Sequence, residues 1–264
     1  MNKIFFIIIV LALLIALWFL FPQKTDDPEF SEAIKPAKIE RYEPTEETTP
    51  QTLIDIDQVD ISEMDNTQTP AIALNDSDTL VKDFLSNAGA TSILENLRDE
   101  VLRRFVMATY AISQGSIPKQ TPFISTTIPP FQATPLFPDK KTYKPNKANA
   151  SRLTPLINQI TKIPPEKFAH LYLENQSLFQ QAFDELGTDK LFDKKLTKAL
   201  DIIIEAPLPP DQPTLVRQTV TYQYQRAKYE NTPPIIKALW RLGKENQLKI
   251  QKYCDVLKDE LKNR

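Results

Sequence analysis

Glycine, histidine and cysteine are scarce in this chain, and each scarcity removes a class of functional site. The 264 residues include four glycines, and each stands where a helical pattern stops, a position that favours a left-handed residue. Nucleotide-binding loops need clustered glycines so that the backbone can approach phosphate, so the common nucleotide fingerprints are excluded. The single cysteine, Cys254, excludes an intramolecular disulfide and any site built from several thiolates.

The one histidine and the one cysteine are both expected to be structural. Helical spacing places His170 on the polar side of an apolar stripe, where no triad or metal partner converges on it. Cys254 shares a helix face with Ile250, Leu257 and Leu261, which favours a small core side chain over a nucleophile. The sequence therefore gives no catalytic, cofactor-binding or metal-binding residue, and no cofactor is expected.

The charge of the chain is divided between two regions. Apolar residues make up 41% and charged residues 25%, the balance of a globular protein. Residues 22–81 carry 15 acidic and four basic side chains, whereas residues 82–264 carry 19 acidic and 27 basic ones. The net charge of −2 thus combines an acidic region with a basic one.

The first 21 residues are expected to form a transmembrane anchor. The run from Ile4 to Phe21 contains 18 residues without a polar side chain. At about 1.5 Å per helical residue, it covers most of a hydrocarbon core about 30 Å thick. Because Pro22, Gln23 and Lys24 offer no small-x-small cleavage site, an uncleaved helix that contacts the lipid bilayer is expected.

The orientation of this helix is less strongly indicated. Lys3 and the amino terminus precede the span, while four basic residues follow within about 20 positions, where such charges count most. That tally weakly favours a cytoplasmic domain. We expect the opposite, a bacterial inner-membrane protein with a periplasmic domain, because the following basic residues are dispersed in an acidic segment.

Residues 22–73 are expected to form a disordered acidic stalk rich in proline and threonine. They contain no glycine and show no sustained helical period, so they cannot bury enough apolar surface to offset their ordering entropy. Aliphatic and acidic residues interleave from Leu53 to Ile61, which could add as a strand to a sheet edge. A solvated tether is the simpler interpretation of so short an alternation.

Residues 74–264 are expected to form a compact, mainly α-helical domain. Apolar residues recur every three or four positions, and the clearest stripe begins at Pro165. Residues 216–224 alternate like a strand and predict at most a small β ribbon. The helical patterns cover residues 76–85, 92–114, 149–162, 165–186, 189–205, 233–242 and 244–262.

A proline-rich loop over residues 117–145 contains the start of the densest basic cluster in the chain. Seven prolines in that stretch argue against long helices. The cluster could contact an anionic partner such as lipid head groups, an envelope polymer or an acidic protein, although a solvated loop is the simpler interpretation. Nucleic acid is not expected, because aromatic residues do not interleave with the charge. The cluster consists of Lys140, Lys141, Lys144, Lys147 and Arg152.

Four short motifs give the chain a resemblance to a known family. They are NDSD at residues 75–78, DEVLRRFV at 99–106, AFDELG at 182–187 and LWRLGKEN at 239–246. Their order and spacing resemble those of the bacterial Domain of Unknown Function 3014 family, over residues 74–261. The resemblance implies a single-pass envelope protein of Gram-negative bacteria with a helical domain and no assigned activity, so no catalytic residue is carried over.

The sequence leaves two functions open. The first is a membrane-anchored cell-envelope interaction or scaffold module, with an unknown protein or envelope partner. The second is an envelope hydrolase that uses carboxylates brought together by folding, since a sequence does not reveal which carboxylates lie close in space.

Overall fold

The domain is described by a computed structural model that covers residues 72–118, 129–137, 141–217 and 221–263. The predicted anchor, nearly all of the predicted stalk and Lys140 lie outside these ranges. Of the helices that the structure describes, none combines the length and the apolarity that crossing a bilayer requires.

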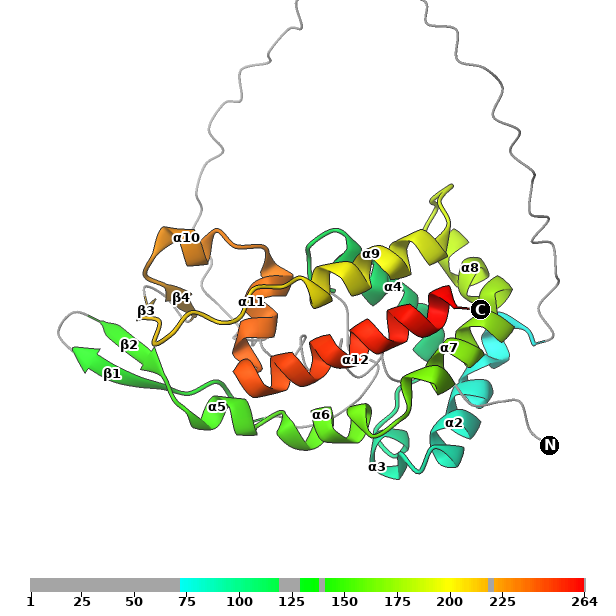
Figure 1. Cartoon of the computed structure of the whole chain (residues 1–264), viewed down its shortest axis with the longest axis horizontal. Coiled ribbons are helices and arrows are strands. Elements are labelled where there is room, and N and C mark those ends of the chain that lie inside the picture. The colour runs from blue at the N-terminus through cyan, green and yellow to red at the C-terminus, as the bar shows by residue number, and fades with distance from the viewer. Residues whose placement is uncertain (1–71, 119–128, 138–140, 218–220, 264) are drawn as a thin grey trace, which may run out of the picture. The chain divides into compact units, whose positions relative to one another are not determined.

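The described chain is mainly helical, as the sequence predicts (Figure 1). A single 3-10 turn, η1 (Leu74–Asp76), precedes the helices. The helices are α2 (Ser77–Asn87), α3 (Thr91–Leu94), α4 (Val101–Ser113), α5 (Ala148–Ser151), α6 (Thr154–Thr161), α7 (Pro165–Glu174), α8 (Gln176–Asp184), α9 (Phe192–Ile204), α10 (Ala227–Glu230), α11 (Pro234–Arg241) and α12 (Lys244–Lys262).

An aromatic cluster forms the centre of the core, where α4 packs against α8 and α9. The ring of Phe105 on α4 lies 5.7–6.1 Å from those of Phe168, Phe179 and Phe192, measured between centroids. These rings are fully buried and meet mostly edge to face, the arrangement that their quadrupoles favour. Burying such a side chain contributes about 1.5–3 kcal/mol, so this cluster is a major source of stability.

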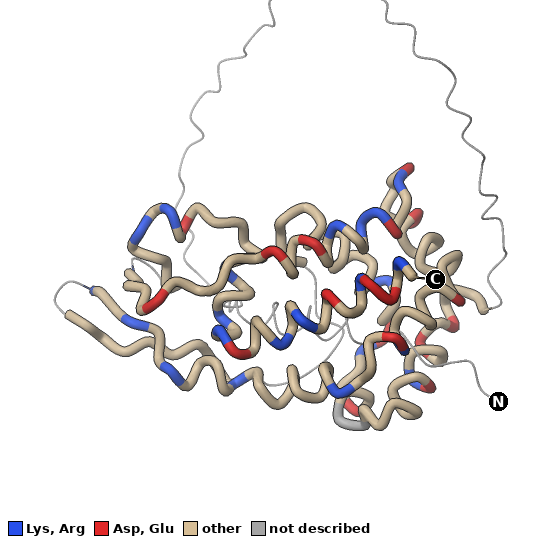
Figure 2. The backbone as a smooth tube through the Cα atoms, viewed as in Figure 1, with Lys and Arg blue, Asp and Glu red and all other residues tan. Residues whose placement is uncertain are grey.

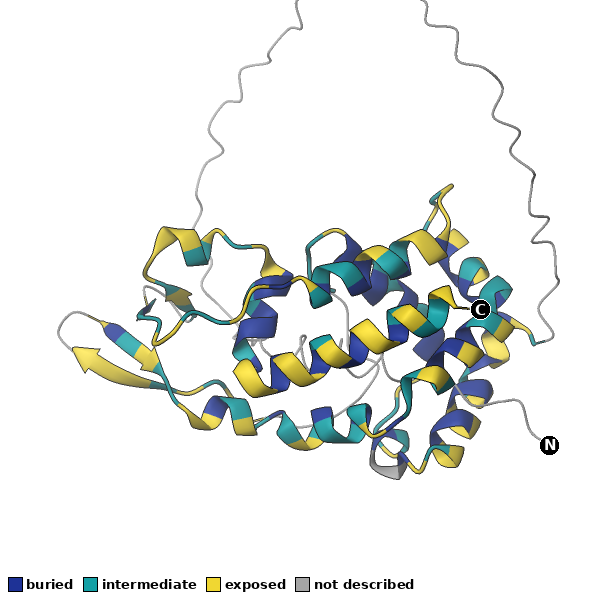
Figure 3. Cartoon of the chain, viewed as in Figure 1, coloured by how far each residue is buried: buried dark blue, intermediate teal, exposed yellow. Residues whose placement is uncertain are grey.

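The long helix α12 completes the core by packing against α6, α7 and α9. One face of the helix is buried and the opposite face is exposed (Figure 3). Cys254 is fully buried on the inner face, as expected, beside Ile250 and Leu257. The periodic apolar pattern of residues 244–262 therefore predicts both the helix and its buried side.

Four short antiparallel strands form a sheet in the order β1-β2-β3-β4. They are β1 (Ala133–Phe137), β2 (Thr142–Pro145), β3 (Leu215–Arg217) and β4 (Tyr222–Tyr224). Tyr143 pairs with Leu215, and Leu215 pairs with Tyr224, so these side chains share one face of the sheet. The expected ribbon supplies β3 and β4 only.

The other two strands arise from the proline-rich loop, which the sequence analysis treated as lacking regular structure. That part of the expectation was wrong. Pro135 lies in β1, at the edge of the sheet, where a residue without an N–H group is tolerated because it need not donate to a further strand. Most of β1 is exposed (Figure 3).

Three predicted helices are each divided in two. The pattern at 165–186 breaks at Asn175, with φ −128° and ψ 24°, although its apolar stripe is buried as expected. The pattern at 149–162 breaks before α6, because Pro155 cannot donate the helical hydrogen bond to the carbonyl of Ser151. The pattern at 92–114 leaves the helix after Leu94 and resumes only at Val101.

Candidate functional site

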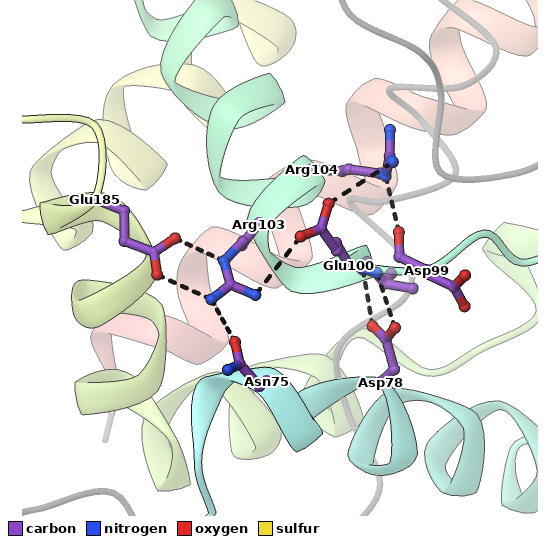
Figure 4. A network of polar contacts seen from close by, with 8 residues as sticks. Asn75, Asp78, Asp99, Glu100, Arg103, Arg104 and Glu185 are labelled. Carbon is purple, nitrogen blue, oxygen red and sulfur yellow. Dashed lines mark hydrogen bonds and ion pairs between the residues drawn. The ribbon is translucent and has the colours of Figure 1, made fainter.

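Arg103 lies at the centre of a polar network that joins three distant segments (Figure 4). Its Nε and Nη2 donate to the two carboxylate oxygens of Glu185, at 2.6 and 2.9 Å. Nη2 also donates to Asn75 Oδ1 at 2.8 Å, and Nη1 lies 3.9 Å from Glu100 Oε1. The planar guanidinium fork suits such two-pronged pairing with a carboxylate, and thus links α4 to the end of α8 and to η1.

Asp78 on α2 caps the amino terminus of α4. Its Oδ2 accepts from the Glu100 amide at 2.8 Å and its Oδ1 accepts from the Val101 amide at 2.9 Å. These amides would otherwise lack a helical partner, and a carboxylate there also interacts favourably with the helix dipole. Glu100 enters the helix with φ 58°, a left-handed conformation. This cap explains why the helix begins at Val101.

The expected ion pair of Asp99 with Arg103 is not formed, because Asp99 precedes the helix. Instead, Arg104 Nε donates to the Asp99 carbonyl at 2.8 Å, while the Nη2 of Arg104 lies 3.9 Å from Glu100 Oε2. The second expected pair, Glu100 with Arg104, is thus present at a long distance.

The network sets the protonation of its central pair. Hydrogen bonding to Arg103 lowers the pKa of Glu185, and the same contact raises the pKa of Arg103. Both groups therefore stay charged at neutral pH. A general acid needs the opposite shift, so Glu185 is unsuited to that role.

A hollow of about 180 Å³ adjoins the network. Met107, Ala182 and Leu186 contribute apolar surface to it, and the charged groups around Arg103 line the remainder. Because Arg103 already holds Glu185, its main effect is to tie segments together rather than to present an unsatisfied charge to a ligand.

The predicted basic cluster is only partly brought together. Lys141, Lys144 and Lys147 are exposed on the β1–β2 hairpin and just after it, and none pairs with an acid among the described residues. Residues 141–165 contain no acidic residue at all, and Figure 2 shows the basic positions along this stretch. Beside them, Leu136 and Phe137 on β1 are 38% and 57% exposed.

Arg152 differs from these lysines because it is half-buried. Its Nη1 donates to the Pro129 carbonyl, its Nε donates to the Asn149 carbonyl at 3.3 Å, and its guanidinium lies 5.8 Å from the centroid of the Phe131 ring. The structure thus separates Arg152 from the exposed lysines with which the sequence grouped it.

The remaining candidates lie as the sequence suggests. His170 is exposed on α7. Burial raises the pKa of the Cys254 thiol to about 12, so the reactive thiolate is disfavoured. Within the described ranges, no three His, Cys, Asp or Glu side chains gather closely enough to hold a metal ion.

Sequence reasoning missed the Arg103 network, although its signal was present in the motifs. NDSD supplies Asn75 and Asp78, DEVLRRFV supplies Arg103, and AFDELG supplies Glu185. Asn75 and Asp78 had been interpreted as local caps of α2, yet α2 shows no side-chain cap hydrogen bond at its start. Their partners instead lie more than 20 residues away in the chain.

A comparison with family models gives one match. The model described as "Protein of unknown function (DUF3014)" matches residues 101–258, which extend from the first residue of α4 into α12. No curated protein and no solved structure matches the chain.

Proposed function

We propose that this chain, which belongs to the DUF3014 family, is a membrane-anchored interaction or scaffold module of the cell envelope. In this proposal, the apolar run from Ile4 to Phe21 holds the protein in the bacterial inner membrane. The acidic stalk then extends the helical domain toward a protein or envelope partner, in the periplasm. The β1–β2 hairpin is the surface that contacts an anionic partner.

The observation that carries this proposal is the combination of charge and apolar exposure on the hairpin. Three exposed lysines, Lys141, Lys144 and Lys147, stand beside the exposed side chains of Leu136 and Phe137. Interfaces typically surround an apolar centre with a polar rim, and exposed basic groups accelerate encounter with an acidic surface. Phe137 would provide the apolar anchor and the lysines would provide the rim.

The alternative, a hydrolase with paired carboxylates, has no comparable support. Glu100 and Glu185 both approach the network hollow, but Arg103 lies between them in the hydrogen-bonding pattern and lowers the pKa of Glu185. A carboxylate pair works as acid and base when like charge raises one pKa, whereas an intervening arginine opposes that effect.

Site-specific photocrosslinking in native membranes tests the proposal. A photoreactive residue in place of Phe137 is expected to give adducts, whereas the same residue in place of Leu248, which is 45% exposed on α12, is expected to give none. The charge-reversed variant K141E/K144E/K147E should suppress the adducts at position 137, as should high salt, because the contact depends on unlike charges.

A matched variant controls for net charge. The substitutions K82E/K194E/K252E reverse three other exposed lysines and should leave the adducts at position 137 intact. Equal loss in both triple variants, or equal adducts at positions 137 and 248, would show that the hairpin is not a specific contact surface.

A further inference from the structure

A second basic feature lies where α5 packs against the turn between α11 and α12. A Cβ atom placed on Gly243 would lie 2.6 Å from the Cβ of Ala150, so the two backbones approach closely. The Nδ2 of Asn246 donates to the Ala150 carbonyl at 2.9 Å. This packing brings Arg152, just after α5, into the neighbourhood of Arg241, at the end of α11.

The guanidinium of Arg152 is only partly satisfied there. Its Nη1 and Nε donate to backbone carbonyls, and its plane lies beside the ring of Phe131. The remaining nitrogen, Nη2, is buried and has no partner in the part of the chain that the structure describes. Leaving a buried donor unsatisfied costs about 1–3 kcal/mol, and more for a charged group. Such a donor is a position at which an external acceptor would be stabilising.

The surroundings of the two arginines have an excess of positive charge. Burial lowers the pKa of both side chains, and the charge of Arg241 lowers that of Arg152 further. Glu230 attracts Arg241, yet its Oε1 holds the Nζ of Lys237 at 3.0 Å, and its Oε2 accepts from the Tyr224 amide at 2.8 Å. Three cations therefore share one carboxylate.

We propose that Arg152 and Arg241 form a binding site for a phosphate-class oxyanion. Guanidinium groups match phosphate oxygens with paired, directional donors, and a phosphate near pH 7 carries about 1.5–2 negative charges, which would balance the excess. The Nη2 of Arg152 would gain its missing acceptor. This site does not depend on the hairpin surface, since neither arginine is among the exposed lysines that form it.

Thermal unfolding of the full chain in detergent micelles tests the site, with inorganic phosphate as the probe at constant ionic strength. Phosphate should raise the melting temperature in a saturable way, because a ligand that binds only the folded state stabilises it. The variant R241K keeps the charge but loses the guanidinium fork, so it should weaken the apparent affinity for phosphate at least about tenfold. The control R98K changes an exposed arginine of the α3–α4 connection and should behave like the wild type.

R152K provides the second variant, and its melting temperature without phosphate shows whether loss of the Pro129 contact unfolds the chain. If R152K does not fold, R241K alone decides. The soluble phosphodiester glycerophosphoglycerol distinguishes two sources of the ligand: equal competition indicates a lipid head group, and binding of inorganic phosphate alone indicates a free phosphate or phosphomonoester. An identical phosphate response in the wild type and R241K, or no response in either, would overturn the proposal.

Discussion

Arg103 on α4 holds both carboxylate oxygens of Glu185, a residue 82 positions later in the chain, at 2.6 and 2.9 Å. The same guanidinium binds Asn75, so a single side chain connects the first turn of the domain to α4 and to the end of α8. All three residues belong to the short motifs through which the chain resembles its family. The family pattern therefore marks, in part, a structural tie between segments.

The Glu185 contact predicts a specific pH dependence of stability. The folded-state pKa of Glu185 lies below its unfolded value of about 4.3, so its contribution is present above that pH and is lost as the pH falls through the folded pKa. The variant E185Q should be less stable than the wild type at pH 7, by no more than about 1 kcal/mol because the pair is partly exposed.

Denaturant unfolding at pH 7 and at about pH 3 measures the effect, and the difference between E185Q and wild type should shrink at the lower pH. E95Q, at an exposed glutamate, serves as the control and should match the wild type at both values. A deficit of E185Q that is equally large at pH 3 would mean that the ion pair is not its cause.

The cap formed by Asp78 predicts a stability loss that is independent of any ligand. The variant D78A removes both acceptors from the start of α4 and should lower the free energy of unfolding by about 0.5–2 kcal/mol, as for other helix caps. D83A changes an exposed aspartate on the same helix, α2, and should have little effect. Similar denaturation midpoints for D78A and D83A would contradict the capping role.

Gly243 predicts a large effect because two constraints coincide there. Its φ of +82° disfavours any side chain, and a Cβ would approach that of Ala150 to 2.6 Å. G243A should cost about 2–5 kcal/mol, the sum of left-handed strain and overpacking. G89A has a similar φ but no atom within 4 Å of the added Cβ, so it should show only the backbone part.

The double variant A150G/G243A separates the two contributions by equilibrium unfolding. Removing the Cβ of Ala150 should recover the steric part of the loss, although glycine also weakens the short α5 helix slightly. No recovery in the double variant would indicate that backbone strain alone makes Gly243 necessary.

Topology gives the last prediction. A reporter that is active only outside the cytoplasm, fused after Arg264, should be active if the domain is exported. Deleting residues 4–21 should abolish that activity, because the apolar run is then the export signal. A stable but inactive fusion of the intact chain would place the domain in the cytoplasm and remove the envelope role proposed above.

Local periodicity predicted much of the helical fold. The pattern at 244–262 coincides with α12, and the patterns at 189–205 and 233–242 contain α9 and α11. The four glycines all have positive φ, as their positions after helical patterns suggest. These features depend on neighbouring residues alone, which is why one sequence is enough to predict them.

The remaining features depend on distant residues and could not be predicted locally. Helical spacing paired Arg103 with Asp99, yet its partner is Glu185, because the helix starts only at Val101 under the Asp78 cap. β1 and β2 contain prolines and were missed, because pairing with β3, about 70 residues away, is what makes them a sheet. The candidate basic site divided similarly, since burial of Arg152 depends on Phe131 and Pro129.

The position of α12 has a consequence for how the domain is made. This helix buries its inner face against α6, α7 and α9, so a large part of the apolar surface of those helices stays uncovered until it arrives. During synthesis, the preceding segments must therefore leave the ribosome before the core can close. The chain would remain in a loosely packed state over that interval, in which chaperones or a translocation channel can bind it before its native structure forms.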